Sequence, residues 1–201
     1  MVKYKKMERM KKMSITFDVQ ATLNRFIPIT VERERQLKIN SFIEEAVVAK
    51  RKEQHHKVDN WGERKRMYTG MLGENALEQY LGVDFIDWSV GDSNYYNRPD
   101  LESLGLKIGV KTVEQFKFPV IHKRVEKPEI ILIRMAKSPN QIILCGYASV
   151  DVLKEYQDDN LIKDPNLRKR GTKTGFNGLH MLHSFRSLDE LKEIHTQCGG
   201  Y

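Results

Sequence analysis

The segments Arg98-Pro99-Asp100-Leu101 and Leu106-Lys107-Ile108-Gly109-Val110-Lys111-Thr112-Val113 decide how the middle of this chain can fold. A turn at Leu104-Gly105 joins them. The second segment is rich in β-branched and apolar residues, so it predicts a strand that begins after the turn. The pattern therefore brings a carboxylate, Asp100, and an amine, Lys111, together at the edge of a sheet.

An acid and a lysine in this arrangement suit phosphodiester hydrolysis. The acid can hold a divalent metal ion, and the lysine can stabilise charge on the attacked phosphate or orient the attacking water. Because alternate residues of a strand share a face, Gly109 and Lys111 point to one side and Val110 to the other. Gly109 then leaves vacant space beside Lys111. Glu74 is the first candidate to fill that space with a carboxylate, and Glu102 is the second.

On this stretch the chain resembles the PD-(D/E)XK nuclease superfamily. Pro99-Asp100 matches the first half of the family motif, and Gly109-Val110-Lys111 stands where the second half lies, with glycine at the position of the expected acid. The resemblance implies that Asp100 bridges one or two Mg²⁺ ions, with Mn²⁺ as a substitute. It also implies a metal ligand in the Val110 carbonyl and a catalytic role for Gln115, which resembles the glutamine that follows the lysine in some branches.

Two helices are expected before this stretch. The first spans about residues 31 to 53, because Thr30 can cap it and apolar residues then recur at helical spacing. The second opens at Asn60, which forms a capping-box pattern with Glu63 three residues later, and it closes at Gly82.

Glu74 lies in the second of these helices. The pair Gly73-Glu74 is similar to the family pattern in which the first core helix carries a glutamate that faces the metal site. A glutamate on a helix is ordinarily solvated, and this plainer interpretation stays open. The place of Glu74 just upstream of Asp100 and Lys111 favours a catalytic and metal-binding role.

Three strands and two further helices complete the expected elements. Val83 to Trp88 predicts the first strand, and the apolar runs from Glu129 to Ile133 and from Gln141 to Tyr147 predict two strands buried on both faces. Helices are expected to start near Ser149 and at Ser187, where Ser187 and Glu190 form a capping-box pattern.

The order of these elements matches a restriction-endonuclease-like fold over about residues 64 to 156. We expect an α/β protein whose central mixed sheet of about four or five strands is flanked by helices. Residues 1–60 are expected to form a basic arm and a helical extension, and residues 61–201 a nuclease-like core with a basic C-terminal segment. The arm, residues 1–13, is either a frayed terminus or a DNA-contacting segment.

The charge balance favours a polyanionic partner. Lysine and arginine number 34 against 27 acidic residues, which gives a formal net charge of +7. Such a balance favours DNA, although a basic composition alone is also compatible with an ordinary soluble protein. Two clusters are candidates for contacts to the phosphate backbone: Lys117, Lys123 and Arg124 in the first, and Arg168, Lys169, Arg170 and Lys173 in the second.

Several classes of site are disfavoured. Cys145 and Cys198 are far apart in dissimilar contexts, which argues against a disulfide framework or a paired-cysteine zinc site and for a reducing cytoplasm. The loop Gly171 to Gly175 lacks the ending of a phosphate-binding loop. His180 and His183 have no further ligands nearby, so packing or solvent exposure is favoured over zinc binding. No apolar run could span a bilayer, so no membrane partner is expected.

The sequence therefore predicts a metal-dependent DNA endonuclease in which a metal-bound water attacks phosphorus. The alternative from another class is a catalytically inactive DNA-binding protein on a nuclease-like fold, because glycine at position 109 weakens metal binding. An RNA-binding protein shares the charge argument, but the aromatic pattern that would favour it is absent. The sequence does not distinguish among restriction, repair, recombination and host-DNA degradation. A homodimer is compatible with cutting two strands.

Overall fold

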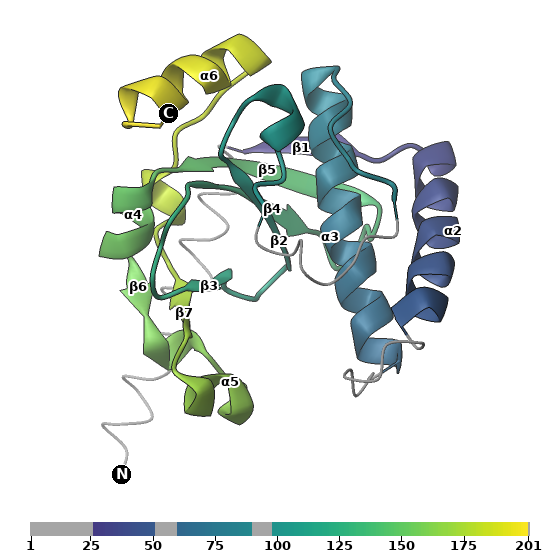
Figure 1. Ribbon diagram of the computed structural model, residues 1–201, viewed down its shortest axis with the longest axis horizontal. Coiled ribbons are helices and arrows are strands. Elements are labelled where there is room, and N and C mark those ends of the chain that lie inside the picture. The colour runs from purple at the N-terminus through teal and green to yellow at the C-terminus, as the bar shows by residue number, and fades with distance from the viewer. Residues whose placement is uncertain (1–25, 51–59, 90–97, 201) are drawn as a thin grey trace.

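The computed structural model of the chain describes residues 26–50, 60–89 and 98–200. The basic arm of residues 1–13 lies outside this part. The described chain is an α/β structure in which helices flank a mixed sheet (Figure 1). Its helices are α2 (Arg33–Lys50), α3 (Asn60–Leu81), α4 (Val150–Glu155), α5 (Pro165–Arg170) and α6 (Leu188–Gln197), with short 3₁₀ turns η2 (Glu102–Leu104), η3 (Asp159–Leu161) and η4 (Leu179–Met181).

Four strands form the central sheet in the order β1-β5-β4-β2. They are β1 (Ile27–Thr30), β2 (Gly109–Glu114), β4 (Glu129–Arg134) and β5 (Gln141–Ala148). Strand β2 runs parallel to β4, whereas β1–β5 and β4–β5 are antiparallel. The expected mixed sheet is confirmed, and β1, which was not predicted, occupies an edge. Pro28 is tolerated there because an edge strand does not need every backbone N–H.

The sheet is buried on both faces, as the continuous apolar runs predicted. Ile130 and Leu132 of β4 pack into a core shared with α2 and α3. The alternating residues Ile131 and Ile133 pack into a second core on the other face, which includes Leu153 of α4. Helices α2 and α3 lie side by side against one face, and α4 lies on the opposite side (Figure 1).

A second sheet, absent from our expectations, lies on the α4 side. It has the order β3-β7-β6 and is built from β3 (Val120–His122), β6 (Gln157–Asp158) and β7 (Lys173–Phe176). Its strands are too short for their alternation to be visible in the sequence. Phe176 is fully buried and joins this sheet to the second core.

The prediction that Thr30 caps the first helix is wrong, because Thr30 ends β1 and α2 begins at Arg33. The helix ends at Gly82, Ser149 and Ser187 match the capping signals. Gly82 follows α3 with φ +67° and donates its N–H to the Glu78 carbonyl at 2.8 Å. The Ser149 hydroxyl accepts from the Val152 N–H, and Ser187 accepts from the Glu190 N–H. The Glu190 carboxylate reaches back to the Arg186 N–H at 2.7 Å, so both ends of the predicted capping box are satisfied.

The prediction of a strand from Val83 to Trp88 is wrong, because this segment pairs with no strand. Its amide groups go to a side chain instead: Glu78 Oε1 accepts from the N–H of Phe85 at 2.7 Å and of Ile86 at 2.8 Å. The other carboxylate oxygen pairs with Arg35 at 3.0 Å. Glu78 is 2% exposed, so a single buried carboxylate fixes this segment to α3 and α2.

We predict that Glu78→Ala lowers the free energy of unfolding by about 2 to 4 kcal/mol, because it removes the acceptor of the Phe85 and Ile86 amides and the partner charge of Arg35. Urea denaturation followed by circular dichroism measures the change. Glu45→Ala on the exposed side of α2 is the matched control and is expected to stay within about 0.5 kcal/mol of the native chain. Equal stability of the two variants would contradict this role of Glu78.

Candidate functional site

Helix α3 approaches strand β2 closely enough to place Glu74 over the strand. The contact is made by Gly73, where a side-chain Cβ would lie 2.8 Å from the Cβ of Thr112. Any larger residue at position 73 would therefore push α3 away from the sheet. Glu74 follows directly in the helix, and its electrostatic neighbours include Asp100 and Lys111.

Asp100 is held at the entrance of β2 by backbone hydrogen bonds. The Leu101 N–H donates to the Ile108 carbonyl at 3.1 Å, which closes the loop between Asp100 and the strand. Asp100 Oδ2 then accepts from the Val110 N–H at 2.6 Å. The predicted proximity of the acid to the strand that carries Lys111 is thus present in the structure, and it leaves the second carboxylate oxygen of Asp100 outside this hydrogen bond.

The space at Gly109 is occupied by Glu129, which the sequence reasoning missed. Gly109 and Glu129 are register partners in the parallel pair β2–β4, so their side chains share a face with Lys111. A Cβ built on Gly109 would lie 2.8 Å from the carboxyl carbon of Glu129. Neither Glu74 nor Glu102 fills that space, and Glu102 is exposed in the 3₁₀ turn η2. A carboxylate from the neighbouring strand therefore occupies the space beside Lys111 that Gly109 leaves.

Two acids at this site, Glu74 and Glu129, have raised pKa values. Burial, followed by the charges of Asp100 and Glu78, raises the pKa of Glu74 to about 8, and Lys111 opposes this shift. Burial likewise raises the pKa of Glu129, an effect that Lys111 and Lys127 counter. Acids whose pKa values are raised by burial beside a specific charged partner mark this region as a candidate functional site.

The donor set fits a divalent metal in its chemistry. Carboxylate oxygens of Asp100, Glu74 and Glu129, with the Val110 carbonyl, are the ligands that Mg²⁺ and Mn²⁺ prefer. A cation among them would favour the ionised form of Glu74, against the burial and the neighbouring acids that raise its pKa. Within residues 26–50, 60–89 and 98–200, no three His, Cys, Asp or Glu side chains are gathered closely enough to hold an ion as they stand.

Gln115 lies past the end of β2 and is engaged elsewhere. Its N–H donates to the Arg134 carbonyl at 2.8 Å, and its side-chain oxygen accepts from the Ala136 N–H at 3.0 Å. Two backbone segments hold it at the far end of the β2–β4 pair, four residues from Lys111. The geometry therefore gives Gln115 a role in ending the strand pair, and the structure does not bring it to the acids.

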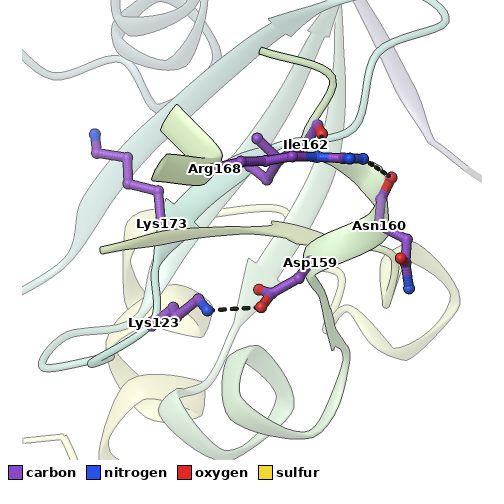
Figure 2. A pocket seen from close by; sticks show the side chains of 6 residues that line it. All are labelled: Lys123, Asp159, Asn160, Ile162, Arg168 and Lys173. Carbon is purple, nitrogen blue, oxygen red and sulfur yellow. Dashed lines mark hydrogen bonds and ion pairs between the residues drawn. The ribbon is translucent and has the colours of Figure 1, made fainter. Parts of the chain in front are cut away.

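Part of the predicted basic surface surrounds a cavity of about 250 Å³ (Figure 2). Lys123 pairs with Asp159 at 2.6 Å, and Arg168 Nη2 donates to the Asn160 carbonyl at 3.2 Å. Figure 2 shows that Lys173 points away from both of these cations. Lys173 and Lys111 interact electrostatically, and together with burial this lowers the pKa of Lys173. Lys173 is thus the residue of this cluster that interacts electrostatically with the candidate site, through Lys111.

The remaining predicted DNA contacts are exposed. Arg124 pairs with Glu126 at 3.1 Å, and Lys117 pairs with Glu114. Lys169 and Arg170 lie in the last turn of α5, and both are exposed. Their exposure is compatible with contacts to phosphates. Their positions do not define the path of a bound strand.

No family model, curated protein or solved structure matches this chain. In the described part of the chain, no helix is long and apolar enough to cross a membrane.

We predict that Glu74→Gln removes a pH dependence of stability in metal-free protein. The unfolded chain ionises Glu74 near pH 4.5, whereas the folded protein keeps it protonated to about pH 8. The folded state therefore holds a proton that the unfolded state has lost, and stability falls as pH rises between these values. The variant should gain about 1 to 3 kcal/mol over the native chain between pH 5 and pH 8.

Urea denaturation in a chelating buffer at both pH values measures this gain. Glu45→Gln, an exposed change on α2, is the control and should show the same pH dependence as the native chain. If Glu74→Gln follows the native pH dependence, Glu74 is ionised at neutral pH and the repulsion inferred here is absent.

Proposed function

We propose that the protein is a metal-dependent deoxyribonuclease of the PD-(D/E)XK type. The observation that carries this proposal is the position of Glu129. Its carboxylate lies over Gly109, on the face of the sheet that also carries Lys111. The constellation of two acids and a lysine that the family resemblance requires is then complete, although its second acid comes from a different strand.

Each residue has a separate task in the proposed reaction. Asp100 and Glu129 would hold the metal, with Glu74 and the Val110 carbonyl as further ligands. A divalent cation bound there would activate water as a Lewis acid and neutralise charge on the phosphate. Lys111, on the same face as Glu129, stabilises the negative charge that develops on the phosphate oxygens in the transition state.

The arrangement of elements supports a restriction-endonuclease-like core at a finer level than the α/β class. The parallel pair β2–β4 is preceded by α3, which packs on it through Gly73 and Thr112. The connection from β2 to β4 carries β3, which pairs with β7 outside the central sheet. Gly109 and Glu129 thus begin two paired strands, and the helix that carries Glu74 packs on β2.

A DNA-binding protein without nuclease activity is the second candidate. One oxygen of Asp100 is already bound by the Val110 N–H, and the described acids do not converge as an ion site without rearrangement. The exposed lysines and arginines would serve such a protein equally well.

We predict Mg²⁺- or Mn²⁺-dependent nicking of supercoiled plasmid by the native chain. Asp100→Asn, Glu129→Gln and Lys111→Ala should each reduce the rate by about a hundredfold or more, because each removes a metal ligand or the charge on the phosphate. Lys154→Ala, an exposed change on α4, is the control and should cut at the native rate. Salt-sensitive plasmid binding without nicking in either metal would favour the second candidate.

We further predict that moving the acid between strands preserves activity. Glu129→Ala alone should abolish nicking, and Gly109→Asp in the same chain should restore at least about a tenth of it, because the new carboxylate occupies the space that Glu129 leaves. Gly109→Asp alone should lose activity, since its Cβ would crowd the Glu129 carboxylate.

The same plasmid assay, with purified single and double variants, measures this rescue. Circular dichroism spectra matched to the native chain exclude misfolding as the cause of a loss. A double variant as inactive as Glu129→Ala would show that the two positions do not serve one acid function.

A further inference from the structure

We propose that the groove between α3 and the end of β2 holds an unpaired DNA strand, so the protein acts on DNA that contains a single-stranded segment. This inference rests on the proposed function, because it names the substrate of the same site. It is argued from the lining of the groove, its charge and one exposed aromatic residue.

The groove has a volume of about 520 Å³. Its apolar lining residues include Val113, Phe118 and Val120, which come from β2, the segment after it and the start of β3. All three side chains are only partly buried. Apolar side chains of this kind suit the faces of bases, whereas the outside of a duplex offers phosphates and hides its bases.

The lining of the groove is also positively charged. Its charged residues are four cations, Lys65, Arg66, Lys111 and Lys117, and one acid, Glu114. Lys65 and Lys117 both pair with Glu114, so they neutralise this acid and leave a positive excess. A polyanionic strand with exposed bases suits both the charged and the apolar lining residues.

Phe116 lies in the chain between Glu114 and Lys117, which both line the groove. Its side chain is 70% exposed, and its backbone has φ +69°, a left-handed conformation that β-carbon sterics disfavour. An exposed aromatic ring and a strained backbone at one residue both oppose stability. A base that stacks on the ring would compensate for these costs on binding.

The groove is continuous with the proposed catalytic site. Lys111 lines it, and on β2 the same lysine shares a face with Gly109, over which the Glu129 carboxylate lies. A strand bound in the groove would therefore run toward the acids. The strand β3 leads from the groove at Val120 to the cavity of Figure 2 at Lys123, so the basic surface extends past the site.

Metal-free full-length protein tests the proposal, because binding is then measured without cleavage. Fluorescence anisotropy compares a labelled oligothymidylate with a blunt duplex of equal length. Phe116→Gly and the double variant Lys65→Ala/Arg66→Ala should each weaken oligothymidylate binding at least about fivefold and leave duplex binding within about twofold. Phe116→Gly should also unfold at equal or higher urea concentration, since glycine accepts a positive φ without strain.

Lys154→Ala/Lys192→Ala, two exposed changes on α4 and α6, is the charge-matched control and should bind both probes as the native chain does. Equal weakening for both probes, or unchanged oligothymidylate binding in the groove variants, would overturn the proposal. Tighter binding of the blunt duplex than of oligothymidylate by the native chain would overturn it as well. Absence of plasmid nicking alone would contradict the nuclease assignment and leave these binding results interpretable.

Discussion

The contact between Gly73 of α3 and Thr112 of β2 is the constraint on which the site depends. It sets how closely the helix can lie on the sheet, because a Cβ at position 73 would overlap the threonine side chain. That distance carries Glu74 to the strand where Lys111 stands, and it buries the carboxyl group enough to raise its pKa. The raised pKa of Glu74 therefore follows from the packing of α3 on β2. Helix α2 and the hydrogen bonds of Glu78 also hold α3 in this position.

Close packing also determines where Glu129, the proposed second acid, can lie. A glycine at position 109 would be a defect if β2 had to supply every catalytic group itself. In a parallel pair, however, the neighbouring strand presents a side chain on the same face at the same level, and Glu129 is that neighbour. The glycine and the glutamate are therefore complementary, since a side chain on one would displace that of the other. A glycine at position 109 is thus compatible with a carboxylate that lies beside Lys111.

Much of the fold could be predicted from the sequence, because its signals are local. The two long helices, the buried strands β4 and β5, the caps at Ser149 and Ser187, and the alternation along β2 follow from periodicity and hydrogen-bonding chemistry. Asp100 and Lys111 could be placed together because a short turn joins their segments, and Glu74 was selected through the resemblance to the nuclease superfamily. Glu129 could not be selected, because its proximity to Gly109 depends on strand order and register, which no local pattern encodes. Val83 to Trp88 was misassigned for the related reason that a distant carboxylate, Glu78, takes the amides that a strand partner would have taken.

The division of the acid and the lysine between two strands has a consequence for how the site comes into being during folding. Residues 109 and 111 of one strand are neighbours even in an unfolded chain, but Glu129 reaches them only after β2 and β4 have paired. Pairing of parallel strands closes a long loop and is intrinsically slow. A nascent chain would therefore carry Asp100 and Lys111 for some time before it acquires the proposed second acid. A shift of β4 by a single residue would turn Glu129 to the opposite face. The proposed site therefore forms only when β2 and β4 pair in the correct register.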